Sequence, residues 1–149
     1  MRHYVLFVIG GLLIGIWGTG CFRPTARAVN QVCFQGQCIA VEVVQKEEEL
    51  RRGLQFRSFL ESDAGMLFIF AANWKHSFWM KDTLIPLDII WMDYARRVVH
   101  IERSVPPCPG EPCPTYTPLY DALYVLEINA GQARALGLRI GDQAEFKLK

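Results

Sequence analysis

The chain has 149 residues, of which 51% are hydrophobic and 21% are charged, and its formal net charge is +1. This length fits one domain of ordinary size, and the hydrophobic content is too high for an intrinsically disordered chain. Nucleic-acid-binding proteins usually carry a strongly basic surface, and a net charge close to zero does not indicate one. The composition therefore favours one globular domain and argues against a nucleic-acid partner.

The first 20 residues have the form of an export signal. Arg2 gives a basic start, and an apolar run then covers residues 5–17. That run has the length of a signal-peptide core and is short for a membrane span. Small residues at 18–20 precede Cys21, which resembles the lipobox of bacterial lipoproteins. We expect residues 1–20 to be a signal peptide or an uncleaved N-terminal anchor, and Cys21 to carry a lipid.

Four further cysteines form two pairs of equal spacing, Cys33 with Cys38 and Cys108 with Cys113. Exported chains fold in oxidising surroundings, so two disulfides are the simplest interpretation, and proximity favours pairing within each spacing. A four-cysteine zinc site and a redox-active thiol pair are the alternatives. Export argues against zinc, and the prolines around the second pair exclude the helix that a redox pair usually opens. We therefore expect two structural disulfides, no metal and no cofactor.

The remaining elements, in chain order, are mostly short strands. After a tether over residues 21–30, the first cysteine pair predicts a hairpin with a glycine turn. A short helix is expected from Lys46 to Gly53, and a second one is expected to be capped by Asn129, with Gln132 three residues later. Alternating or apolar runs predict strands at residues 39–44, 66–70, 77–80, 84–92, 97–103, 124–128 and 143–148. Seven or eight short strands with two short helices predict a mainly β (α+β) domain, small and barrel-like, over residues 31–149.

The segment between two of these strands carries the best candidates for ligand binding. Trp79, Lys81, Asp82 and Thr83 offer an aromatic face, a cation, a carboxylate and a hydroxyl in one loop. We expect Tyr116 and the loop of the second cysteine pair to complete this surface. In the alternative interpretation Trp79 belongs to the core and residues 81–83 form a simple turn.

Asp88 is a sixth candidate because it stands inside an apolar strand. An ionised carboxylate there is costly unless it is paired, and Lys81 or Arg57 could be the partner. Asp88 could equally be a buried structural acceptor. Asp82 and Asp88 together could also divide the acid and base roles of a hydrolase. The chain has no nucleophile elbow, phosphate loop or zinc-protease motif.

Several stretches are similar to the exported family called "domain of unknown function 192". The resemblance rests on residues 52–57, 65–68, 78–88, 107–116, 124–131, 137 and 141–142. It implies a compact β-rich fold on the outer side of the cytoplasmic membrane and no established activity. Asp82 stands where this family usually has asparagine.

These observations together predict an exported domain that a lipid or anchor tethers to a membrane. We expect it on the extracytoplasmic side, in the periplasm or at the cell surface. There it would act as a binding or accessory module for an envelope ligand or protein. The alternative is a small envelope hydrolase using Asp82 and Asp88.

Overall fold

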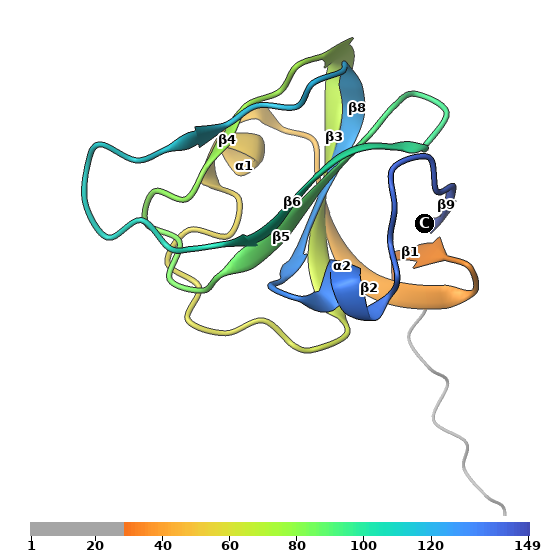
Figure 1. Cartoon of the computed structure of the whole chain (residues 1–149), viewed down its shortest axis with the longest axis horizontal. Helices are drawn as coiled ribbons and strands as arrows, with labels where there is room; N and C mark the ends of the chain where they lie inside the picture. Colours follow the sequence, from red (N-terminus) through yellow and green to blue (C-terminus); the bar gives the residue numbers. More distant parts are fainter. Residues whose placement is uncertain (1–28) are drawn as a thin grey trace, which may run out of the picture.

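The computed structural model describes residues 29–149, so the expected leader, Cys21 and most of the tether lie outside the described residues. This described part contains nine strands and two short helices. Seven strands form one sheet in the order β6-β5-β8-β3-β2-β1-β9, which curls into a half-barrel (Figure 1), and β4 pairs with β7 in a separate small sheet. The predicted mainly β, barrel-like domain is thereby confirmed. Between residues 29 and 149, no helix has the length and apolar character needed to cross a membrane.

The main sheet contains strands of four to eleven residues, and the two strands of the small sheet have two residues each. The strands are β1 (Gln31–Phe34), β2 (Gln37–Val44), β3 (Ala64–Trp74), β4 (Phe78–Trp79), β5 (Leu87–Met92), β6 (Val98–Val105), β7 (Thr115–Tyr116), β8 (Ala122–Asn129) and β9 (Ala144–Lys147). The helices are α1 (Glu47–Arg52) and α2 (Gln132–Ala135). Helix α1 connects β2 to β3, which lie parallel in the sheet.

The first hairpin forms as predicted. Cys33 on β1 lies opposite Cys38 on β2, and a disulfide joins them. The turn residues Gln35 and Gly36 both have positive φ, at 49° and 84°, which is typical of the tight two-residue turns that match strand twist. A second disulfide joins Cys108 to Cys113. Both predicted pairings are confirmed, and they indicate an oxidising, exported environment.

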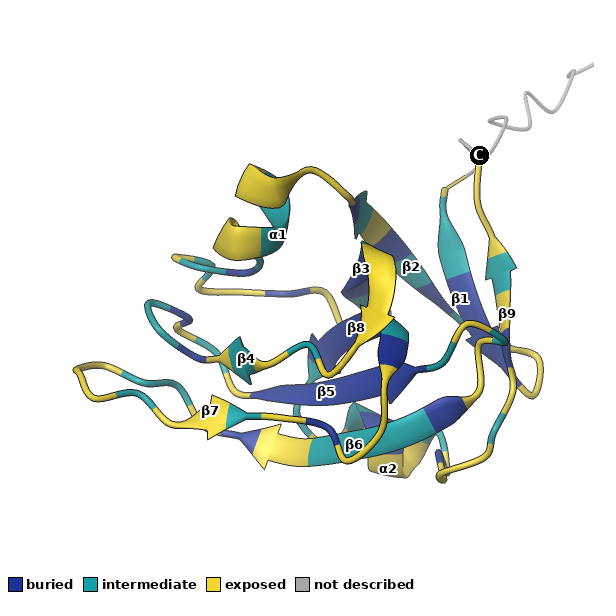
Figure 2. Ribbon diagram, turned by 90° about the horizontal axis from the view of Figure 1, so that it is seen from above, coloured by how far each residue is buried: buried dark blue, intermediate teal, exposed yellow. Residues whose placement is uncertain are grey.

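Two hydrophobic cores lie on opposite faces of the sheet because successive side chains of a strand point to opposite sides. Along β8, Leu126 and Ile128 belong to the first core, whereas Val125 belongs to the second. Helix α2 contributes Ala133 to the first core, and Leu50 of helix α1 packs against the second. Figure 2 accordingly shows the two helices on opposite sides of the sheet.

The expected cap of the second helix is wrong. Helix α2 has Gly131 as its N-cap, with φ 84°, and Asn129 is the last residue of β8. The Asn129 side chain instead donates to the carbonyl oxygens of Leu60 and Glu61, at 3.1 and 3.0 Å. The Asn129 side chain therefore makes a long-range contact and does not cap the helix as the local pattern predicts.

Strand β7 is not among the strands that the sequence predicts, and it follows the loop of the second cysteine pair. It has only two residues, and its single partner is the equally short β4. Strand β5 also begins later than expected, at Leu87, directly after Pro86. Proline cannot donate to a strand ladder, so the strand starts beyond it.

Candidate functional site

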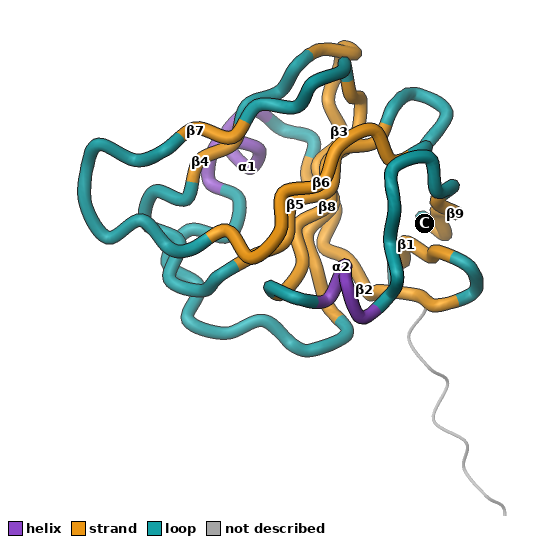
Figure 3. Tube along the Cα trace, viewed as in Figure 1, coloured by secondary structure: helices purple, strands orange, loops and turns teal. Residues whose placement is uncertain are grey.

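The segment predicted to bind a ligand lies against a part of the chain more than thirty residues away. Phe78 pairs with Tyr116 and Trp79 pairs with Thr115, so β4 and β7 run side by side (Figure 3). The Ser77 hydroxyl also bonds the hydroxyl of Thr117 at 2.8 Å. The two strands thus lie together, but Tyr116 is opposite Phe78 and packs with it against the second core, so its side chain and that of Trp79 lie on opposite faces of this small sheet.

The second disulfide loop supports this segment from the other side. Lys81 forms a parallel bridge with Cys108, and the N–H of Cys108 donates to the carbonyl of Met80 at 3.3 Å. The Lys81 ammonium pairs with Glu111 inside the loop and lies 5.6 Å from the centroid of the Trp79 ring. The hydrogen bond to Glu111 raises the pKa of Lys81 and lowers the pKa of Glu111. Lys81 is therefore engaged within the protein.

Asp88 is placed away from the other predicted residues. It is completely buried, and its two carboxylate oxygens accept main-chain N–H groups of Ser104 and Ala133, at 2.7 and 2.8 Å. Its side chain faces the first core, whereas Met80 and Phe78 pack with the second. Lys81 and Arg57 are not its partners, because each pairs with a glutamate elsewhere. The geometry is that of a structural acceptor.

Asp82 occupies the turn that follows β4. Its φ of 56° lies in the left-handed region, which asparagine and aspartate tolerate better than most residues. Its carbonyl accepts the N–H of Phe56 at 2.7 Å. This backbone requirement explains why either an aspartate or the asparagine usual in the resembling family can stand here. Thr83, the next residue, is buried, with 6% of its surface exposed.

Between helix α1 and strand β4 the structure has a cavity of about 220 Å³, which we call the Glu127 pocket. Four aromatic side chains line it, Phe68, Phe70, Phe78 and Trp79, together with Glu127. The other residues around it include Leu50, Arg51, Arg52, Gly53, Leu54, Gln55, Ser77 and Thr83. Its volume corresponds to roughly seven water molecules, so it suits a small ligand.

Glu127 is the buried acid of this pocket. It lies on β8 between Met66 of β3 and Ile89 of β5, and only 4% of its surface is exposed. None of the described residues gives its carboxyl group a hydrogen bond or an ion pair, and loss of solvent is what raises its pKa to about 8. Glu127 is therefore mostly protonated and neutral at pH 7.

Gly53 leaves the acid accessible from the helix side. It ends α1 by donating its N–H to the carbonyl of Glu49 at 2.9 Å, as the sequence predicted. Its φ is 49°, and a Cβ there would lie 3.2 Å from Cζ of Phe68 and 3.9 Å from Oε2 of Glu127. A side chain at this position would strain the backbone and press on the ring and the acid.

The aromatic walls are held at fixed angles. The Phe78 ring lies at 88° to the ring of Phe68 and at 89° to that of Phe70, with centroid distances of 5.0 and 6.2 Å. Phe70 in turn stacks on the His76 ring, at 3.6 Å and 10°. These perpendicular contacts place aromatic surface around the pocket from more than one direction.

The site therefore combines Trp79 and Thr83, which the sequence predicted, with Glu127, which it did not. The signal for Glu127 was available, since it is an acid inside an apolar strand. The same signal selected Asp88, and the structure shows that of these two acids Asp88 has main-chain donors for its carboxylate and Glu127 has none.

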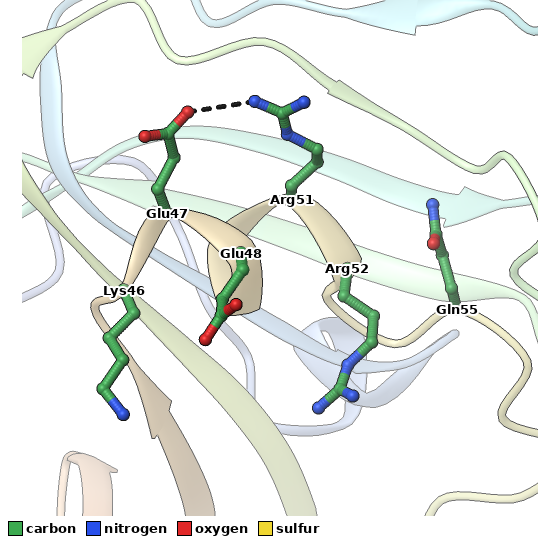
Figure 4. A pocket seen from close by; sticks show the side chains of 6 residues that line it. All are labelled: Lys46, Glu47, Glu48, Arg51, Arg52 and Gln55. Carbon is green, nitrogen blue, oxygen red and sulfur yellow. Dashed lines mark hydrogen bonds and ion pairs between the residues drawn. The ribbon is translucent and has the colours of Figure 1, made fainter.

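A larger hollow of about 590 Å³ lies against α1, and Figure 4 shows the six side chains that line it. Arg51 reaches back to Glu47 at 3.0 Å, while Arg52 extends to another side of the helix. The Glu47 and Arg51 side chains are 88% and 76% exposed. These residues form a solvated charged surface with no buried polar group, so they make a weaker candidate than the Glu127 pocket.

Comparisons with known proteins agree with the suspected family. Residues 30–146 match the model of the DUF192 family, described as "Uncharacterized ACR". A crystal structure of a protein of unknown function from Novosphingobium aromaticivorans DSM 12444 has 30% sequence identity and a TM-score of 0.69, covering 91% of this chain and 99% of that one. A candidate transcription regulator from Sinorhizobium meliloti 1021 has 28% identity and a TM-score of 0.69, covering 78% and 91%. No curated protein matches this chain significantly.

The stretches that carry the family resemblance converge on the Glu127 pocket. Gly53 comes from the first stretch, Phe68 from the second, Trp79 and Thr83 from the third, and Glu127 from the segment of β8. Segments separated by up to 74 positions in the sequence thus meet around one cavity.

Proposed function

This chain belongs to the DUF192 family, and we propose that it is an exported binding module, tethered to a membrane of the cell envelope, whose ligand site is the Glu127 pocket. The observation that carries the binding function is Glu127 itself. It is a buried acid without a partner in the described chain, at an opening lined by aromatic rings.

Burying an acid without a partner destabilises a folded protein, because the group loses its hydration and gains no hydrogen bond in return. Asp88, the other buried acid in an apolar strand, does not have this problem, because two main-chain N–H groups donate to its carboxylate. Glu127 has instead a cavity beside it. A bound ligand would supply the missing partner, and this supports a binding role for the pocket.

Two features support the location. The two disulfides fit folding outside the reducing cytoplasm. The apolar run before Cys21 has the form of an export signal, and a lipid on that cysteine would hold the domain at the membrane. Intact mass measurement of the protein from the membrane fraction tests the tether. A diacyl or triacyl mass on Cys21 supports it, and an unmodified chain that begins elsewhere refutes it.

The alternative hydrolase would need Asp82 and Asp88 to act on one substrate. Both oxygens of Asp88 already accept main-chain hydrogen bonds, and its side chain faces the first core. Asp82 lies in the turn that packs beside Phe56, next to the second core. The geometry therefore favours binding over hydrolysis by this pair.

Ligand-observed saturation-transfer NMR on the full chain tests the binding function. The probes are five small solutes, of which one is a cation, one a zwitterion, one an anion and two are neutral: choline, glycine, acetate, glucose, and the neutral analogue of choline in which carbon replaces the ammonium nitrogen. Gln55→Trp places an indole at the pocket, which Gln55 lines. Gln37→Trp adds the same group on the exposed end of β2 and is the matched control.

At least one probe should receive saturation from the wild type and from Gln37→Trp, and lose it in Gln55→Trp. Binding of no probe, or binding that is unchanged by Gln55→Trp, would overturn the assignment of the pocket as a ligand site.

A further inference from the structure

We infer that the ligand of the Glu127 pocket is a small organic ammonium ion, bound between the aromatic rings and the Glu127 carboxylate. This inference rests on the proposed binding function and names the chemical class of the ligand. Two independent features of the pocket point to it. One is the arrangement of the rings, and the other is Glu127, whose carboxyl group has no partner among the described residues.

The rings favour a cation. An aromatic ring carries negative charge density on its faces, so it attracts an ammonium group placed over it, and more strongly where water is excluded. Phe78 lies perpendicular to both Phe68 and Phe70, so the cavity is bounded by rings in different orientations. A compact group such as a methylated ammonium can contact several rings at once, whereas a flat ring can stack on one face only.

The acid favours the same ligand. An ammonium ion beside the ionised Glu127 carboxylate attracts it directly, and this attraction offsets part of the cost of removing both charges from water. A bare metal ion fits poorly, since it needs several oxygen or nitrogen ligands, and the described residues contain no cluster of three histidines, cysteines or acids. An anion would bind beside Glu127 only while the acid keeps its proton, so its affinity would fall as the pH rises through 8, which is the opposite trend to that of a cation.

A sugar fits less well for a reason specific to Trp79. Stacking on a sugar needs a free indole face, and Lys81 already lies 5.6 Å from the centroid of this ring. The Lys81 ammonium is itself held by Glu111. The indole of Trp79 therefore already contacts a cation of the protein, whereas the rings of Phe68, Phe70 and Phe78 are available to contact the ligand.

The helical segment beside the pocket carries no net charge. Helix α1 carries three glutamates and two arginines, and with Lys46 before it the segment is formally neutral. Arg51 pairs with Glu47 at 3.0 Å, and Lys46 with Glu49 at 3.5 Å. Arg51 and Arg52 also line the pocket, so a bound cation has to draw its attraction from the rings and from Glu127 after that acid has ionised.

Binding of such a cation requires Glu127 to release its proton to the surrounding buffer. The charged groups that line the pocket with it are Arg51 and Arg52 of α1. Its neighbours on β3 and β5, Met66 and Ile89, carry no charge, and His76 stacks on Phe70. Because the pKa of Glu127 is about 8, the affinity for a cation that does not itself titrate should increase about tenfold for each unit by which the pH rises up to 8, and should level off above pH 8.

Titration calorimetry of the full chain with choline, whose quaternary ammonium does not titrate, tests the inference at whole pH units from 6 to 9. The same titration is run with Glu127→Gln, with the neutral carbon analogue of choline, and with Glu145→Gln. Glu145 lies exposed on β9 and is the matched acid outside the pocket. Repeating the pH 7 titration in two buffers of different ionisation enthalpy measures the proton released.

Choline should bind the wild type and Glu145→Gln with release of close to one proton at pH 7, and at least tenfold more weakly to Glu127→Gln at pH 8. Affinity for the neutral analogue that equals that for choline would overturn the ammonium class and leave the pocket as a binding site. Affinity for choline that is independent of pH and of Glu127 would overturn it as well. If no probe binds, or if Gln55→Trp leaves the binding of every probe unchanged, the binding function itself is wrong.

Discussion

Replacing Glu127 with glutamine should remove a pH dependence from the folding stability. The folded-state pKa of Glu127 is about 8, against an ordinary value of 4.5. Between these two values the folded chain keeps a proton that the unfolded chain has released, so the free energy of unfolding falls as pH rises. Below pH 4.5 both states hold the proton, and above pH 8 both have lost it, so the effect is confined to this window.

The size of the effect follows from the shift. Each pH unit in the window costs about 1.4 kcal/mol for one proton, so the wild type should lose about 3 kcal/mol from this group between pH 4.5 and pH 7. Glutamine keeps nearly the same shape and cannot ionise. The stability of Glu127→Gln relative to the wild type should therefore grow by about 3 kcal/mol over that range.

Urea denaturation of the full chain, followed by far-ultraviolet circular dichroism at whole pH units from 4 to 9, measures this difference. Other titrating groups contribute equally to both proteins, so subtracting the two curves isolates Glu127. Glu145→Gln, exposed on β9, should show no comparable trend. If the curves of Glu127→Gln and the wild type run parallel across the window, Glu127 is not a neutral buried acid, and the reasoning about the pocket fails.

Three further changes probe the surroundings of the pocket. Asp88→Asn should destabilise the fold by about 2 kcal/mol in urea denaturation, because an amide has only one acceptor oxygen for the two main-chain donors, and should leave choline binding unchanged. Gly65→Ala should cost about 2 kcal/mol or more, since its Cβ would lie 2.7 Å from the carbonyl oxygen of Glu127, whereas Gly110→Ala, with open space around it, should be nearly neutral. Replacing Cys108 and Cys113 together by serine should lower the stability by about 2 kcal/mol and speed amide exchange in β4 and β7. The matching change at Cys33 and Cys38 should leave exchange in β4 and β7 as it is in the wild type, and equal exchange in both double variants would contradict this role of the loop.

The features that the sequence predicts well are local ones. Alternating and β-branched runs place most strands, and equal spacing predicts both disulfides, because neighbouring residues alone decide these outcomes. β7 could not be predicted in this way, since it has two residues and exists only through its pairing with β4. The amide of Asn129 was misassigned for the same reason, because its acceptors lie 68 and 69 positions earlier in the chain.

The choice between Asp88 and Glu127 shows where sequence reasoning ends. Both are acids inside apolar strands, and β5 and β8 are neighbours in the sheet, with Asp88 opposite Ile128. This one-residue offset puts the two acids on opposite faces. The donors that satisfy Asp88 come from Ser104 and Ala133, which the fold alone brings to it. No local pattern could therefore tell the satisfied acid from the unsatisfied one.

The short length of α1 explains why the unsatisfied acid stays accessible. The helix has six residues and none of them is buried, so it covers the second core only in part, and Gly53 ends it beside Phe68 and Glu127. A cavity sealed from solvent would leave the acid with neither water nor ligand, which would cost more stability. The same opening thus limits the cost of burying Glu127 and admits a ligand to it. We therefore expect Glu127→Gln to be more stable than the wild type at neutral pH and to have lost cation binding. This one variant would show that Glu127 lowers stability and is needed for binding.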